Sequence, residues 1–370
     1  METPAWAVVE LAAVRHNVAL LRERAAGAQL MTVVKADGYG HGMVPCAGAA
    51  LEAGADWLGV AQVGEALRLR AAGIAAPVLC MMAIPGEPYE AAIKARVDVT
   101  AASAAMVTEI AEAATRAGRP ARLQLKADTG LSRGGATAGE WPAVVGEAMA
   151  AQAVGHVRVT GLWSHLASAD LPGHPSTDRQ LDAFAWALEG AEKAGVRPEV
   201  RHIANTAAAL TLPAARLDLV RPGGAVYGLS TLPGGAPAEF RPAMTLRTRL
   251  AQVKQVAAGT GVSYGHRYVT TREARLGLLP LGYADGVPRT ASGRALVQAR
   301  GRRWTVAGTV CMDQFVVDFG SEPVAAGDEV VLFGPGDDGE PTAQEWADKL
   351  GTISYDIVTG IGNRVRRVYC

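Results

Sequence analysis

Short apolar runs alternate with alanine-rich segments of helical spacing from the N-terminus to about residue 230. Val, Leu and Ile follow one another in these runs without a polar residue at every second position, which predicts strands buried on both faces. Strands of this kind pair in parallel and need helical crossovers between them. The eight predicted strands end near Lys35, Ala61, Met82, Thr100, Lys126, His165, Asn205 and Arg221.

The alanine-rich segments predict the helices that connect these strands. Three helices are predicted at 63–72, 104–117 and 178–194, and each is followed directly by a glycine (Gly73, Gly118 and Gly195). Glycine ends helices because it accepts the left-handed backbone conformation. Eight strand–helix units in about 230 residues predict an α/β protein with a closed (β/α)8 TIM barrel. The alternative is a doubly wound open sheet, but the segment KADGYGHG (35–42) lacks the glycine spacing of that fold's phosphate turn.

The pattern changes at a Pro/Gly-rich stretch, 232–237. Beyond it, strand-like runs dominate, at 244–256, 276–281, 295–299, 304–310, 315–319 and 329–333, with one helix at 343–350. We therefore predict two domains: the barrel over 1–235 and a mainly β domain over 236–370. The first few residues of the chain are candidates to pair with the β domain.

Charge and composition narrow the range of partners. The 36 basic and 36 acidic residues balance and form no basic stripe, so neither nucleic acid nor anionic lipid is an expected partner. No apolar run reaches the roughly 18 residues of a membrane span, and the N-terminus lacks the features of a secretory signal. The four cysteines lie far apart, which predicts free thiols in a reducing cytoplasm and no disulfide or metal site.

Polar residues gather at the ends of the predicted strands. Lys35, Lys126, His165, Asn205 and Arg221 each end a strand or follow it directly. The carboxyl ends of barrel strands form the rim that carries the active site in this fold. We therefore expect these five side chains to line one site.

Several segments together resemble the alanine racemases, pyridoxal 5′-phosphate enzymes built from a barrel and a β domain. The first is VKADGYGHG (34–42), which is similar to the family's cofactor-lysine motif. Further matching segments follow in order at 126–133, 163–165, 202–206, 221–224, 262–265, 282–286 and 311–314. The resemblance covers nearly the whole chain. It implies interconversion of L-alanine and D-alanine, which supplies D-alanine for peptidoglycan.

The resemblance assigns two proton-transferring residues. Lys35 is the expected Schiff-base lysine, and such an amine needs a lowered pKa, which burial among other cations provides. Tyr264 is the expected second base, on the opposite face of the substrate. A phenol has an ordinary pKa of about 10 and needs nearby positive charge for this role. In the family this tyrosine comes from the partner subunit, which implies a homodimer with shared active sites.

The resemblance also assigns the contacts of the cofactor. Arg221 is expected at the pyridine nitrogen, where a guanidinium can only donate, so the ring stays unprotonated and side reactions are suppressed. His165 is expected to orient Arg221, with an ordinary core histidine as the alternative. The expected phosphate ligands are Tyr39, Thr206 (commonly a serine in the family), Gly223, Gly224 and Tyr355, and Asn205 completes the cofactor-binding set.

Substrate contacts follow from the same resemblance. Arg133 is expected at the cofactor's phenolic oxygen and at the substrate carboxylate. Lys126 would crowd Arg133, and many family members relieve this repulsion by carbamylating the lysine. Met312 and Asp313 are expected to reach the carboxylate and the substrate channel from the partner subunit, with Tyr283 at the channel entrance.

Other interpretations stay open at the level of the residues. A non-catalytic barrel protein that carries the cofactor would lack the β domain with Tyr264. A decarboxylase of this fold type tends to be longer and needs a polar pocket, and broad-specificity racemases often have secretion signals and disulfides. A racemase for serine stays a further alternative. A pocket bounded by Tyr264, Tyr355 and Met312 has room for little more than a methyl group, which favours a small substrate.

Overall fold

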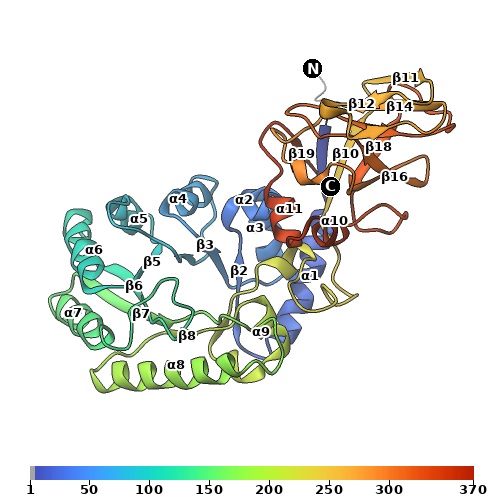
Figure 1. Cartoon of the computed structure of the whole chain (residues 1–370). Helices are drawn as coiled ribbons and strands as arrows, with labels where there is room; N and C mark the ends of the chain where they lie inside the picture. The colour runs from blue at the N-terminus through green and yellow to red at the C-terminus, as the bar shows by residue number, and fades with distance from the viewer. Residues whose placement is uncertain (1–4) are drawn as a thin grey trace.

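The computed structural model describes residues 5–370, which form an α/β barrel and a mainly β domain (Figure 1). The barrel contains eight parallel strands in the order β8-β7-β6-β5-β4-β3-β2-β9. Their bounds are β2 (Gln29–Val33), β3 (Trp57–Val60), β4 (Val78–Cys80), β5 (Asp98–Ala101), β6 (Ala121–Lys126), β7 (Val157–Trp163), β8 (Val200–His202) and β9 (Leu219–Val220). The predicted fold class is confirmed.

The strand order decides between a barrel and an open doubly wound sheet. Consecutive strands are neighbours throughout, and the last strand, β9, pairs with the first, β2. Two main-chain hydrogen bonds link the segments of β8 and β9. The amide of Asp218 donates to the carbonyl of Arg201 (3.2 Å), and the amide of Arg221 donates to the carbonyl of Ala204 (3.0 Å). The sheet therefore closes on itself, whereas a doubly wound sheet reverses its order at a switch point.

Helices connect and cover the barrel strands. They are α1 (Leu11–Arg24), α2 (Lys35–Tyr39), α3 (Met43–Glu52), α4 (Val63–Ala71), α5 (Tyr89–Lys94), α6 (Ala104–Ala117), α7 (Trp141–Ala153), α8 (Pro175–Lys193) and α9 (Thr206–Thr211), with 3-10 turns η1 (Pro213–Ala215) and η2 (Gly224–Tyr227). Gly73, Gly118 and Gly195 have φ values of 83°, 68° and 96°. The prediction that left-handed glycines end these helices is confirmed.

The β domain is built on a nine-stranded sheet that includes the start of the chain. Its order is β11-β14-β17-β16-β15-β18-β10-β1-β19. The strands are β1 (Ala5–Val9), β10 (Met244–Arg249), β11 (Gln252–Val256), β14 (Ala274–Leu279), β15 (Leu296–Ala299), β16 (Arg302–Ala307), β17 (Phe315–Asp318), β18 (Glu329–Phe333) and β19 (Arg366–Tyr369). Strand β1 pairs antiparallel with β10 and parallel with β19, so the chain enters the barrel from this sheet.

Smaller elements complete the β domain. They are the two-stranded ribbon β12 (Gly261–Val262) and β13 (Tyr268–Val269), the turns η3 (Tyr264–His266) and η4 (Arg289–Ala291), and the helices α10 (Ala343–Leu350) and α11 (Ser354–Thr359). The predicted helix at 343–350 matches α10. None of the helices described over residues 5–370 is long and apolar enough to cross a membrane.

Two details of the β domain differ from the sequence pattern. The run 244–256 forms two strands. The main-chain amide of Leu250 donates to the carbonyl of Asp328, whereas the amide of Ala251 donates to the carbonyl of Leu278, so the chain passes here from one part of the sheet to another. Helix α11 was not expected, since six residues complete fewer than two turns and show no clear periodicity.

One hydrophobic core joins the two domains. It contains Val9 of β1, Leu21 of α1, Ala208 of α9, Leu246 of β10 and Ile357 of α11. Figure 1 shows α10 and α11 beside α2 and α3, between the barrel and the β sheet. This continuous packing holds α11 of the second domain against the mouth of the first.

Candidate active site

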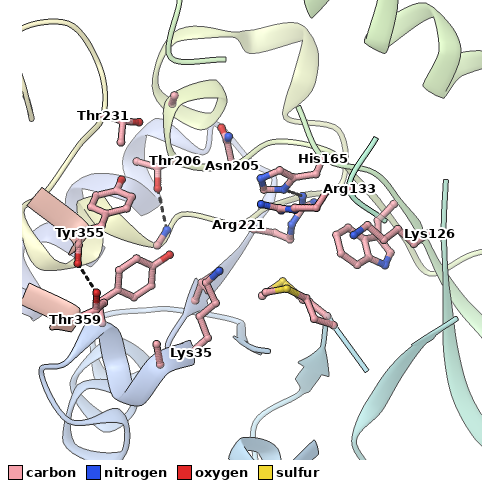
Figure 2. Close-up of a pocket in the computed structure, with 18 residues that line it drawn as sticks. Lys35, Lys126, Arg133, His165, Asn205, Thr206, Arg221, Thr231, Tyr355 and Thr359 are labelled. Atoms are coloured by element: carbon pink, nitrogen blue, oxygen red, sulfur yellow. Dashed lines mark hydrogen bonds between the residues drawn. The ribbon is translucent and has the colours of Figure 1, made fainter. Parts of the chain in front are cut away.

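A hollow of about 410 Å³ opens at the carboxyl ends of the barrel strands (Figure 2). Its wall includes Lys35, Tyr39, Lys126, Arg133, His165, Asn205, Thr206, Arg221, Gly223 and Tyr355, together with Val33, Ala36, Met81, Met82, Trp163, Ala207, Thr231 and Thr359. The five strand-end residues singled out in the sequence therefore line one cavity. In Figure 2 the Lys35 side chain points into the cavity, between the hydroxyl groups near Tyr355 and the cations near Arg221.

Lys35 begins a left-handed helical turn. The next four residues have positive φ values: Ala36 (52°), Asp37 (51°), Gly38 (66°) and Tyr39 (53°). Left-handed backbone costs a non-glycine residue roughly 1–2 kcal/mol, so surrounding contacts have to hold the turn in place. The amide of Gly38 donates to Val34 (2.8 Å), and the amide of Ala36 donates to the carboxylate of Glu65 (2.7 Å). This turn directs both Lys35 and Tyr39 into the hollow.

The two lysines of the hollow are pushed toward their neutral forms. Burial lowers the pKa of Lys35, Arg133 lowers it further, and Glu65 partly opposes the shift. Burial, with the charges of Arg133 and Arg221, lowers the pKa of Lys126 to about 8. Lys126 Nζ also lies 4.6 Å from the ring centroid of Trp163, where the π face stabilises a cation. Lys35 is thus a candidate amine nucleophile and proton acceptor.

Arg221 is buried and held from several sides. Its Nη1 donates to Nδ1 of His202 at 2.7 Å, and its Nη2 donates to the carbonyl of Ser164 at 2.8 Å. Nε2 of His202 is 2.8 Å from Oε1 of Gln124. Because the amide oxygen can only accept, His202 carries its proton on Nε2 and offers Nδ1 to Arg221. Burial and Arg221 hold the pKa of His202 well below its usual range, which keeps this ring neutral.

His165 lies on the other side of the same guanidinium. Its Nδ1 is 3.4 Å from Nη2 of Arg221. Burial, followed by the charges of Arg221, Arg133, Lys126 and Lys35, lowers the pKa of His165 to about 3. Four basic side chains therefore surround one hollow. Such a site favours a ligand with several negative charges.

Hydroxyl groups and Gly223 form the opposite wall, and Gly224 lies beside the Tyr355 hydroxyl. Thr206 Oγ1 accepts a hydrogen bond from the amide of Gly223 at 2.9 Å. A Cβ at Gly223 would collide with the hydroxyl of Tyr39, and one at Gly224 would collide with that of Tyr355. Burial raises the pKa of Tyr355 to about 12 and that of Tyr39 further, so both phenols stay protonated. This wall is a cradle of neutral donors in which only glycine fits beneath the tyrosines.

Asn205 and two threonines complete this wall. Asn205 Oδ1 accepts from the amide of Ala208 (3.1 Å), which caps α9 and leaves the side-chain NH2 group for other contacts. Thr359 donates to the carbonyl of Tyr355 (2.6 Å), and Thr231 hydrogen-bonds to the Tyr355 side chain. The Thr359 contact holds the main chain of Tyr355, and the side-chain hydrogen bonds with Thr206 and Thr231 position its hydroxyl.

The remaining expected residues lie elsewhere, on the β domain. Tyr264, Tyr283 and Met312 are 73%, 45% and 54% exposed, which is high for large apolar side chains. Together with Asp313 they line a separate hollow that shares no wall residue with the barrel mouth. Asp313 pairs with Arg364 at 2.8 Å. Within one chain the structure does not bring Tyr264 to Lys35.

Sequence reasoning gave no role to two residues that hold the cationic wall. Trp163 has its ring 5.0 Å from the Arg221 guanidinium and also contacts Lys126. His202 orients Arg221. Both stand at the ends of predicted strands, as the assigned residues do, and that position was the available signal.

These walls fit pyridoxal 5′-phosphate. The glycine and hydroxyl cradle suits a phosphate, because the neutral phenols of Tyr39 and Tyr355 and the hydroxyl of Thr206 can donate to its oxygens. Arg221, Arg133 and Lys126 suit the phosphate and a carboxylate, and Lys35 is an amine placed between the two walls. The fold and this hollow together define the class: an α/β-barrel enzyme with a mainly β second domain and a lysine in the hollow at its barrel mouth.

Comparisons with known proteins give the family. Residues 9–231 match the N-terminal domain model of alanine racemase, and residues 243–369 match the C-terminal domain model. The alanine racemase of Thermobifida fusca (strain YX) is 58% identical over 369 residues, which cover 100% of this chain and 99% of the relative. The chain belongs to the alanine racemase family.

Solved structures agree with this assignment. The crystal structure of alanine racemase from D-cycloserine-producing Streptomyces lavendulae is 56% identical, with a TM-score of 0.98 over 100% of this chain and 98% of that one. The alanine racemase of Streptomyces coelicolor A3(2) is also 56% identical, with a TM-score of 0.97 over 99% and 98% of the two chains.

Proposed function

We propose that this protein interconverts L-alanine and D-alanine with pyridoxal 5′-phosphate, using Lys35 and Tyr264 as two opposed proton carriers. It acts in the cytoplasm as a homodimer, and the D-alanine it makes is used for peptidoglycan. The observation that carries the proposal is Lys35, an amine of lowered pKa between a phosphate cradle and a cationic wall. The alanine racemase names of its relatives support the substrate.

Different residues of the barrel mouth would hold different parts of the cofactor. Tyr39, Thr206, Tyr355 and the Gly223–Gly224 backbone would hold the phosphate, and Arg221 would donate to the ring nitrogen. When bound, the cofactor would supply an electron sink for the electron pair left on the substrate when the Cα proton departs. Arg221 has no acceptor atom and keeps its proton at neutral pH, so it holds the ring nitrogen unprotonated. This limits electron withdrawal and favours return of a proton to Cα.

Lys35 carries the proton on one face of the substrate. An amine accepts a proton only in its neutral form, and the lowered pKa of Lys35 increases that form near neutral pH. The left-handed turn fixes the origin of the side chain, so Nζ faces the hollow (Figure 2). Proton transfer needs this fixed approach, because donor and acceptor have to come within hydrogen-bond distance.

Tyr264 of a second copy carries the proton on the other face. Exposed patches of large apolar residues mark interaction surfaces, and Tyr264, Tyr283 and Met312 form one such patch. A second barrel mouth set against the patch would bring the Tyr264 hydroxyl toward Arg133, Lys126 and Arg221. Their positive charge favours the phenolate that a base requires.

Substrate size and orientation follow from the same arrangement. Arg133 would bind the substrate carboxylate and the cofactor's phenolic oxygen, and Met312 and Asp313 of the partner would close the site over the carboxylate, with Tyr283 at the channel entrance. Carbamylation of Lys126 would exchange its repulsion of Arg133 for attraction. Tyr355, Met312 and Tyr264 leave space for a methyl group, which selects alanine.

Proton exchange in deuterium oxide tests the proposal. With added pyridoxal 5′-phosphate and L-alanine, we expect loss of optical rotation together with incorporation of deuterium at Cα. Lys35→Ala should abolish both, whereas the same change at Lys254, an exposed lysine of β11, should leave both unchanged. Release of carbon dioxide without D-alanine would contradict the proposal and indicate a decarboxylase.

A further inference from the structure

A second cavity, which we term the junction cavity, lies between the two domains and apart from the barrel mouth. Its volume is about 260 Å³, and it shares no wall residue with the active-site hollow. The linker 228–244, the segment 334–344 and the helix α11 contribute its wall. Most of this wall is apolar, and Leu229, Phe240 and Met244 are among its larger side chains. No lysine, arginine, aspartate or glutamate of residues 5–370 lines it.

Two buried polar atoms in this wall lack a hydrogen-bond partner. His41 and Ser354 are 0% and 1% exposed. Neither Nε2 of His41 nor Oγ of Ser354 forms a hydrogen bond with any group of residues 5–370. A buried polar atom without a partner costs about 1–3 kcal/mol, and such atoms are uncommon in folded proteins. Two of them on one cavity wall point to a ligand that pairs with them.

The protonation state of His41 defines what that ligand has to offer. Its Nδ1 lies 2.9 Å from the carbonyl of Tyr39 and 3.1 Å from that of Gly38, so Nδ1 carries a proton and donates. Burial lowers the pKa of His41 to about 4, which leaves Nε2 without a proton at neutral pH. Nε2 is therefore an acceptor that needs an external donor, while the Ser354 hydroxyl can donate or accept.

The other hydroxyl groups of the wall already have partners. Ser230 accepts from the amide of Leu232 (3.1 Å), and Thr342 accepts from the amide of Glu345 (3.1 Å). The hydroxyl of Tyr227 donates to the carbonyl of Val33 (3.3 Å). His41 and Ser354 are thus the wall residues that each keep an unpaired polar atom, in a wall that is mostly apolar.

We propose that the junction cavity is a binding site for a small neutral molecule with an apolar body and a hydroxyl group, which donates to His41 Nε2 and pairs with Ser354. The uncharged wall disfavours ions, since a buried charge needs a partner. The site adjoins the active site from behind: His41 follows the turn that carries Lys35, and Ser354 begins the helix that carries Tyr355.

A matched pair of probes tests this site on the holoenzyme. We would titrate 4-methylphenol and toluene, which differ only in the hydroxyl group, and follow saturation transfer by ligand-observed NMR. The hydroxyl should make 4-methylphenol bind roughly two- to tenfold more tightly than toluene, the worth of one buried hydrogen bond. Equal affinities, or no saturable binding of either probe, would overturn the proposal.

Three variants locate the binding. Ser354→Ala removes an unpartnered hydroxyl and should weaken the binding of 4-methylphenol without changing that of toluene. Ala238→Phe, at the exposed rim, should weaken the binding of both probes. Ser321→Ala, at an exposed serine outside the cavity, should change neither affinity. Affinities that Ser354→Ala and Ala238→Phe leave unchanged would refute the site. A crystal soaked with 4-methylphenol that shows only ordered water at His41 would refute it too. Racemisation plays no part in this test, so its failure leaves the proposed function standing.

Discussion

At the scale of single residues, the barrel mouth keeps several basic side chains close together, and Glu65 and Asp128 only partly offset the charge of its two lysines. Lys126 and Arg221 are 7% and 3% exposed, and both contact the ring of Trp163. Behind them, Nε2 of His202 donates a hydrogen bond to Oε1 of Gln124. The side-chain amide of Gln124 in turn donates to the buried carboxylate of Asp98 at 3.1 Å. The charge of Arg221 is therefore stabilised by oriented dipoles and π faces, which leaves its guanidinium available to a ligand.

The charge of Lys126 should reduce the stability of the fold below pH 8. Its pKa falls from 10.5 in the unfolded chain to about 8 in the fold, so the unfolded state binds more protons between these values. The free energy of unfolding should then rise with pH from about 8 to 10.5, by up to about 3 kcal/mol. Lys126→Met should raise the unfolding free energy by about 1–3 kcal/mol at pH 7 and by little above pH 10.5.

Urea unfolding at pH 7 and pH 10.5 measures this difference, with Lys254→Met on exposed β11 as the control. A Lys126→Met protein that is less stable than the parent at pH 7 would contradict the prediction. That result would indicate a carbamylated Lys126, whose negative charge attracts Arg133.

At the scale of elements, the left-handed turn after β2 decides where Lys35 and Tyr39 point. Ala36 has φ 52° and ψ 50° and is exposed, so a glycine there loses no buried contact. Ala36→Gly should change stability by between zero and a gain of about 1 kcal/mol, because relief of left-handed strain offsets the added chain entropy. Ala185→Gly, in the exposed middle of right-handed α8, should instead cost about 0.5–1 kcal/mol.

Thermal unfolding of the two alanine variants in parallel makes the comparison. Equal losses at both positions would show that Ala36 is not strained in solution. The left-handed turn would then not be what directs Lys35 into the hollow.

The elements also show what the sequence could and could not predict. The apolar runs predicted the eight strands, their parallel order and the strand ends that line the hollow. They could do so because strands buried on both faces appear in the sequence as nearly continuous apolar runs. The left-handed turn did not, since Lys35–Tyr39 contains one glycine among five residues and tertiary contacts hold it. The role of His202 was missed because a buried hydrogen bond between residues 19 positions apart leaves no periodic signal.

At the scale of the whole molecule, each chain presents a barrel-mouth hollow without Tyr264 and, apart from it, an exposed patch that contains Tyr264, Tyr283 and Met312. Met312→Asp, at a side chain 54% exposed within this patch, should weaken self-association and reduce racemase activity together, because the interface would bury an unpaired charge. Val154→Asp, at a side chain 67% exposed beyond α7, should change neither. Sedimentation velocity at several concentrations, run beside activity assays, distinguishes the two variants. An active monomer of Met312→Asp would contradict this account.

Mixing two inactive variants tests the sharing of active sites most directly. Lys35→Ala and Tyr264→Phe would be unfolded, mixed in equal amounts and refolded together, so that about half of the dimers contain one chain of each kind. If each site takes Lys35 from one chain and Tyr264 from the other, every mixed dimer regains one intact site, and about one quarter of wild-type activity should return. Activity no higher than that of the separate variants would show that both groups serve the same chain's site, contrary to the account.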